Sequence, residues 1–139
     1  MKVLFQSTVN NPLFFLYLAC FSFIFKPGMP SKPESILKDL EANKFAPIYF
    51  LQGEEPYFID KITGFIENNA LAPQDRSFNQ TIMYGKDATV ASILNNAKRF
   101  PMMADRQVVI VKEAQNIPDL GKELGDQQLI AYIKNPLPS

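Results

Sequence analysis

The run Lys98-Arg-Phe-Pro-Met-Met-Ala-Asp-Arg-Gln-Val-Val-Ile-Val-Lys112 marks a passage from a helix to a buried strand. Pro101 cannot continue a helix and disfavours helical angles at Phe100, so the preceding helix is expected to end here. The apolar residues that follow predict a strand buried on both faces. Met102 and Met103 therefore fall on a connection, where binding residues often collect. Methionine is flexible and polarizable, so the pair suits either a surface that grips a partner or a gap in the core.

Outside this run, helix-like and strand-like segments alternate. The sequence predicts helices over 33–45, 55–71, 88–99 and 127–134, and strands over 47–52, 77–84 and 106–112. Such alternation favours an α/β fold, in which a parallel sheet carries helices on its faces. The tail after residue 134 reads as a connection to a further strand, so we expect a domain that is truncated at its C-terminal end.

Composition excludes several kinds of site. The chain has 139 residues, which suggests one domain, and it contains no histidine and one cysteine. Zinc sites of the usual Cys/His kinds, histidine-based triads and an intrachain disulfide are therefore excluded. The formal net charge of zero gives no sign of the clustered basic face that binds nucleic acid.

Residues 1–28 differ from the rest of the chain, because they form an apolar N-terminal extension without acidic residues. The apolar run from Pro12 to Phe25 is shorter than the roughly 20 residues of a usual membrane span. Leu18-Ala-Cys20 resembles a lipoprotein cleavage box only faintly. The extension is either a signal or anchor segment, or it is translated from a misplaced start upstream of a true start at Met29. The misplaced start is the preferred interpretation.

Gly53, Glu54 and Glu55 lie between a predicted strand and a predicted helix, where an α/β protein commonly places a phosphate loop. A working loop needs several glycines, a lysine and a serine or threonine. Two carboxylates at a helix N-terminus suit the helix dipole and would repel a triphosphate. The sequence therefore predicts no nucleotide site and no cofactor, and the two acids are helix-start residues rather than a catalytic pair.

Three stretches, taken in order, are more specific together than each is alone. They are Pro47-Ile-Tyr-Phe-Leu-Gln-Gly-Glu-Glu-Pro-Tyr-Phe-Ile59, Phe100-Pro-Met-Met-Ala-Asp-Arg-Gln-Val-Val-Ile-Val111 and Leu129-Ile-Ala-Tyr-Ile-Lys-Asn-Pro-Leu-Pro-Ser139. In this order they resemble the N-terminal domain of the delta subunit of bacterial DNA polymerase III, a clamp-loader family. The resemblance implies that residues 29–139 form an incomplete domain of the P-loop NTPase or AAA+-like kind without a nucleotide site.

The resemblance also implies a function. A subunit of this family is cytoplasmic and non-catalytic, and it belongs to the DNA polymerase III holoenzyme, a nucleotidyltransferase complex. It binds and opens the sliding clamp (the beta subunit) during DNA replication through an exposed apolar pair. That pair falls here on Met102 and Met103, flanked by Phe100 and Pro101, where the family often has leucine and phenylalanine. The other loader subunits, gamma/tau and delta prime, would bind through C-terminal domains that this chain lacks, and DNA would be met only by the complex.

Two other classes of function stay open. The chain could be a membrane-tethered or exported α/β binding domain with an unknown ligand, or an α/β enzyme whose catalytic residues lie in a missing C-terminal part. A natural N-terminus at Met29 would favour the clamp loader. Processing near Cys20 would favour the exported domain.

Overall fold

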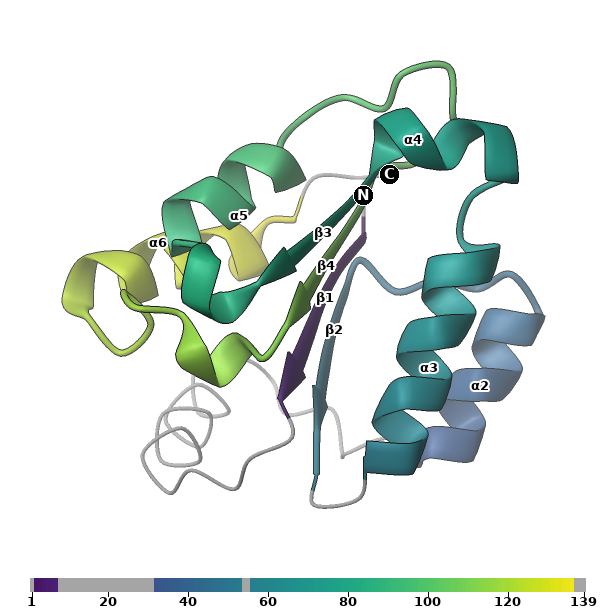
Figure 1. The fold of residues 1–139 in the computed structure, drawn as a ribbon, viewed down its shortest axis with the longest axis horizontal. Helices are drawn as coiled ribbons and strands as arrows, with labels where there is room; N and C mark the ends of the chain where they lie inside the picture. Colours follow the sequence, from purple (N-terminus) through teal and green to yellow (C-terminus); the bar gives the residue numbers. More distant parts are fainter. Residues whose placement is uncertain (1, 8–31, 54–55, 137–139) are drawn as a thin grey trace.

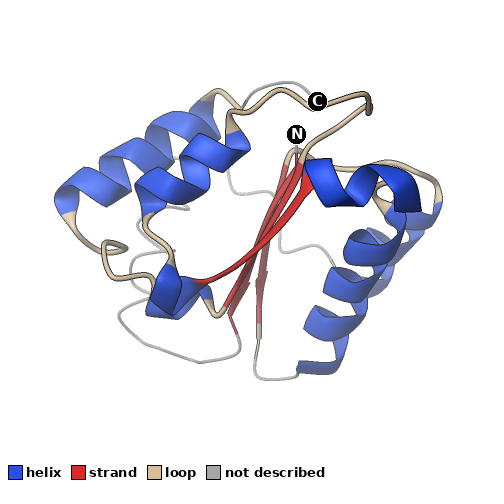
Figure 2. Cartoon of the chain, turned by 45° about the horizontal axis from the view of Figure 1, so that its top comes forward, coloured by secondary structure: helices blue, strands red, loops and turns tan. Residues whose placement is uncertain are grey.

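The computed structural model describes residues 2–7, 32–53 and 56–136. In this part the strands are parallel and form a sheet in the order β2-β1-β4-β3 (Figure 1). The strands are β1 Lys2–Ser7, β2 Ile48–Gln52, β3 Gln80–Tyr84 and β4 Val108–Lys112. The longer helices are α2 Pro33–Glu41, α3 Pro56–Asn69, α5 Val90–Ala97 and α6 Glu123–Lys134. Figure 2 shows helices on both faces of the sheet, so the predicted α/β class with a parallel sheet is confirmed.

Strand β4 connects the two hydrophobic cores. Its Val108 and Ile110 pack into the cluster that α2 and α3 close over one face, while Val109 and Val111 pack into the cluster under α5 and α6. All four side chains are fully buried. Burying each of them contributes about 1.5–3 kcal/mol, so β4 is central to the stability of both layers.

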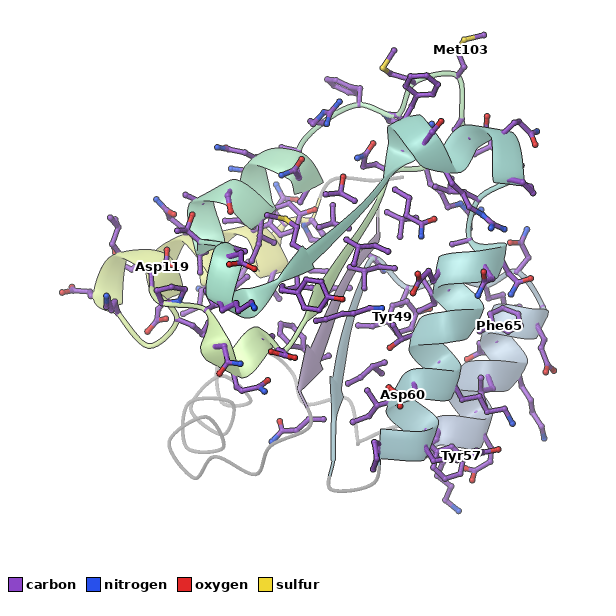
Figure 3. The ribbon with its side chains drawn as sticks, in the orientation of Figure 1. Tyr49, Tyr57, Asp60, Phe65, Met103 and Asp119 are labelled. Carbon is purple, nitrogen blue, oxygen red and sulfur yellow. The ribbon has the colours of Figure 1, made fainter. Side chains whose placement is uncertain are left out.

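Helix α5 begins at Val90, two residues after the predicted start at Ala88, and Thr89 is its cap. Thr89 and Ser92 form a capping box, in which each side chain accepts a hydrogen bond from the other residue's backbone N–H. The carboxylate of Asp119 also accepts from the backbone N–H of Val90, at 3.0 and 3.1 Å. This contact ties the start of α5 to the connection before α6, near the position labelled Asp119 in Figure 3.

The predicted strand over 77–84 is wrong in its first half. A 3-10 turn, Pro73–Asp75, leads into the one-turn helix α4, Arg76–Asn79, and β3 begins only at Gln80. The amide of Asn79 donates to the backbone oxygen of Asp75 at 3.1 Å, which closes the helical turn. Phe78 therefore lies in α4 rather than in the strand, and its side chain is 63% exposed.

Strand β1 was not among the elements that the sequence pattern predicts, since no strand is expected upstream of residue 29. Lys2–Ser7 pairs with β2 on one side and with β4 on the other. Residues 8–31 lie outside the described part, as does the apolar run 12–25, so the start at Met29 stays a prediction. None of the helices in the described ranges is long and apolar enough to cross a membrane.

Gly85 and Gly64 allow a matched test of the packing. A Cβ at position 85 would lie 2.2 Å from the backbone oxygen of Glu113, which is a clash with main chain. We expect Gly85→Ala to lower the free energy of unfolding by about 1–3 kcal/mol. Gly64 lies inside α3 and has open space where its Cβ would be, so Gly64→Ala should raise stability by about 1 kcal/mol. Urea denaturation of both variants checks the pair, and equal effects would contradict the close approach at Gly85.

Tyr49 makes stability depend on alkaline pH. Burial raises the pKa of Tyr49 above its ordinary value of 10.0, while the hydrogen bond that its oxygen accepts from the Ala46 N–H partly lowers it. The unfolded chain then loses the phenol proton before the folded chain does. The stabilising effect of the buried neutral phenol is therefore present below pH 10.0 and is lost as pH rises through the folded pKa.

We expect Tyr49→Phe to flatten the loss of unfolding free energy above about pH 10. Losing the bond to Ala46 should lower stability by about 1 kcal/mol, and this effect adds an offset at neutral pH. Tyr57→Phe, at a tyrosine that is 62% exposed, is the control. Chemical denaturation between neutral and strongly alkaline pH checks the prediction, and an alkaline loss in Tyr49→Phe as steep as in the wild type would refute it.

Candidate functional site

The connection between α5 and β4, residues 98–107, crosses the amino edge of the sheet. Val108, which follows it, pairs with Lys2 and with Gln80, the first residues of their strands. The connection therefore arches over the end of the sheet where the strands begin (Figures 1 and 2). Parallel α/β sheets usually bind nucleotides at the opposite, carboxyl edge. A site on this connection is thus separate from any former nucleotide site.

Four neighbouring residues, Phe100, Pro101, Met102 and Met103, form what we call the apolar crest. Phe100 is 89% exposed, Met102 55% and Met103 99%, whereas Pro101 is half-buried. Figure 3 shows Met103 pointing away from the body of the molecule. The methionines therefore do not fill gaps in the core. Large contiguous apolar patches on a protein surface mark protein–protein or membrane contacts or ligand-binding grooves.

The backbone of the crest has an unusual conformation. Met103 has a φ of 56°, in the left-handed region that residues other than glycine rarely adopt. Such a conformation costs about 1–3 kcal/mol and persists when neighbouring contacts impose it.

Asn79, at the end of α4, contacts the backbone of Met102, the residue before Met103. Its side-chain amide donates to the Met102 carbonyl at 2.9 Å, and its side-chain oxygen accepts from the Met102 N–H at 2.6 Å. Asn79 is fully buried. Sequence reasoning missed this residue, because its partner lies far along the chain and no local pattern connects the two.

Two cavities lie on either side of the connection. One, of about 440 Å³, is polar and lies between the end of α3, the turn before α4 and the residues just after the crest. Its lining includes Asn68, Arg76 and Arg106. The other, of about 560 Å³, is largely apolar and lies between α5 and α6, where Phe100 and Tyr132 contribute to its wall.

Polar groups at the base of the crest lack hydrogen bonds. The Arg106 guanidinium lies 4.6 Å from the centre of the Phe45 ring, and its Nη1 is buried without a hydrogen-bond partner among the described residues. The Nε2 of the buried Gln107 is also without one. Buried unsatisfied donors are few in native proteins, and each one is a candidate for strain or function.

The prediction about the phosphate loop remains a prediction. Gly53 follows β2 directly, but Glu54 and Glu55 lie outside the described residues. Within the ranges that the structure describes, no group of His, Cys, Asp and Glu side chains could hold a metal ion. The apolar crest is therefore the best-defined candidate site of the described chain.

Comparison with known proteins places the chain in a family. The family model for the DNA polymerase III delta subunit matches residues 49–139, a range that includes the crest. The DNA polymerase III subunit delta of Bacillus subtilis (strain 168) is 25% identical over 107 residues. The aligned region is 74% of this chain but 31% of that relative, so the chain spans about a third of the relative's length. No solved structure matches. Since the family model covers more than half of the sequence, the chain belongs to the DNA polymerase III delta subunit family.

Proposed function

We propose that this chain is part of a non-catalytic clamp-loader subunit that binds the sliding clamp and favours its opening during DNA replication. The observation that carries the proposal is the exposed apolar crest, Phe100 to Met103, in a member of the delta subunit family. The crest presents large apolar side chains on the connection between α5 and β4, which belongs to neither helical layer. It therefore suits insertion into an apolar pocket of a partner protein.

Energetics support insertion as the source of affinity. Moving an exposed methionine side chain from water into an apolar pocket contributes about 1.5–3 kcal/mol. Met103 and Phe100 are almost entirely exposed in the free chain, so nearly their whole apolar surface is available for burial in a complex. Binding opens the ring only if the open ring is bound more tightly than the closed one, because a ligand shifts an equilibrium by that difference.

The wider role of the subunit is part of the same proposal. We assign residues 29–139 to a P-loop NTPase or AAA+-like domain that binds no nucleotide, although Lys2–Ser7 of the 1–28 extension pairs into its sheet. ATP would be hydrolysed by partner subunits of the loader, whose other members are gamma/tau and delta prime, and DNA would contact the assembled loader in the cytoplasm. No observation in the described ranges favours a membrane-tethered or exported domain.

The double variant Met102→Ala/Met103→Ala tests the function. Each truncation at a central apolar anchor typically costs about 2 kcal/mol, so we expect affinity for the sliding clamp of the same bacterium to fall by at least about 100-fold. Surface plasmon resonance with the immobilised clamp measures this loss. The unfolding free energy should stay within about 0.5 kcal/mol of the wild type, because both side chains are exposed.

Leu124→Ala provides the control. Leu124 is 69% exposed and lies on α6, away from the connection that carries the crest. It should leave clamp affinity unchanged. A wild-type chain that is folded yet shows no saturable binding to the clamp would refute the proposed function. Binding that survives in the double variant would refute the assignment of the crest.

A further inference from the structure

We propose that Asn79 is a positioning residue that holds the apolar crest in its binding conformation before the partner arrives. The inference rests on the proposed function for the identity of that partner. Asn79 is fully buried, so it would not contact the clamp itself. It acts through the main chain of Met102.

The contact between Asn79 and Met102 uses both functions of one amide. The side-chain oxygen accepts from the Met102 N–H at 2.6 Å, and the side-chain nitrogen donates to the Met102 carbonyl at 2.9 Å. Two hydrogen bonds to the N–H and the carbonyl of one residue resemble the pairing between neighbouring strands. They fix the position and the orientation of the Met102 backbone. Met103, the next residue, is consequently held where its side chain projects into solvent.

Asn79 is itself attached to the rest of the fold. Its amide also donates to the backbone oxygen of Asp75 at 3.1 Å. The neighbouring Arg76 donates from Nε to the carbonyl of Leu71 at 3.4 Å and from its guanidinium to the carbonyl of Asn68. These bonds connect α4 to the end of α3. The crest is therefore attached through α4 to the end of α3.

The left-handed backbone of Met103 explains why such a support matters. A φ of 56° is unfavourable at a methionine, so a loop without support would leave this conformation. If only a fraction of molecules holds the competent conformation, the apparent Kd rises in inverse proportion to that fraction. The two bonds from Asn79 offset this tendency and keep the crest preorganised.

The chemistry of the contact requires an amide. An ionised aspartate at position 79 could accept from the Met102 N–H but would face the Met102 carbonyl without a proton to donate. Alanine would remove both bonds and leave the N–H and the carbonyl of Met102 without these partners. A protonated aspartic acid, in contrast, has one acceptor and one donor in nearly the same places as asparagine. Burial favours that neutral form.

The test compares Asn79→Ala, Asn79→Asp and the control Asn96→Ala in the whole chain. Asn96 is a half-buried asparagine on α5 that donates to the Ser92 carbonyl at 2.9 Å. We expect Asn79→Ala to speed hydrogen exchange of the Met102 N–H by at least tenfold while the amides of Val109 to Val111 stay protected. Clamp affinity should fall by at least tenfold, and Asn96→Ala should change neither quantity.

Asn79→Asp adds a pH dependence that reports on the proton donated to the Met102 carbonyl. Its exchange rate at Met102 and its clamp affinity should resemble those of Asn79→Ala at pH 8 and recover toward wild type as the pH is lowered, after correction for the wild-type pH dependence. Absence of this recovery, or unchanged exchange at Met102 in a folded Asn79→Ala, would overturn the proposal. So would the loss of cooperative unfolding in both Asn79 variants.

The two proposals fail separately. If the wild type does not bind the clamp, the proposed function is lost, but exchange at Met102 still tests the positioning by Asn79. If the wild type binds and Asn79→Ala binds equally well, the crest needs no preorganisation and the positioning role alone is refuted.

Discussion

Burial of β4 on both faces is the constraint on which the rest of the structure depends. Val108 to Val111 are fully buried, and alternate side chains enter opposite cores, so neither helical layer can form without this strand. A strand that is apolar on both faces does not fix its own register by alternation, because a shift of one residue still buries apolar side chains. Polar residues at its two ends supply that information. Gln107 is buried at the start, and Lys112 forms a 3.4 Å ion pair with Glu67 of α3 at the end.

The local sequence pattern correctly predicts the elements in which all signals indicate the same secondary structure. Pro56–Asn69 and Val90–Ala97 carry helical periodicity, and Ile48–Gln52 and Val108–Lys112 are short apolar runs, so all four lie close to their predicted positions. Helix α4 was missed because its residues also suit a strand, and the bonds that decide for a helix involve Asp75 and Asn68. Strand β1 was not predicted, because the apolar run after it led us to interpret residues 1–28 as a single extension. Its pairing partners are also distant in sequence.

In the candidate site, too, some features follow from the local sequence and others depend on residues that are distant in the chain. The proline and the paired methionines indicate a connection, yet sequence alone leaves open whether methionine faces solvent or core. The fold decides, because α5 ends at Ala97 and the chain must then cross the amino edge of the sheet to reach β4. The polar base of the crest has no sequence signal. Within the described residues Arg106 and Gln107 each bury a donor without a partner, and such unsatisfied donors are rare in native proteins.

The place of β1 has a consequence for how the chain folds. Its residues precede those of the other three described strands in the chain, yet it lies between β2 and β4, and β4 lies near the other end of the described chain. The sheet cannot be completed by neighbours in sequence, and folds dominated by such distant pairings form slowly, on a scale of milliseconds to seconds. Until β4 has left the ribosome, β1 and β2 are strands with unpaired edges. Exposed edges of this kind are prone to aggregation. Strand β1 thus finds both of its neighbours only after the chain has been made as far as β4.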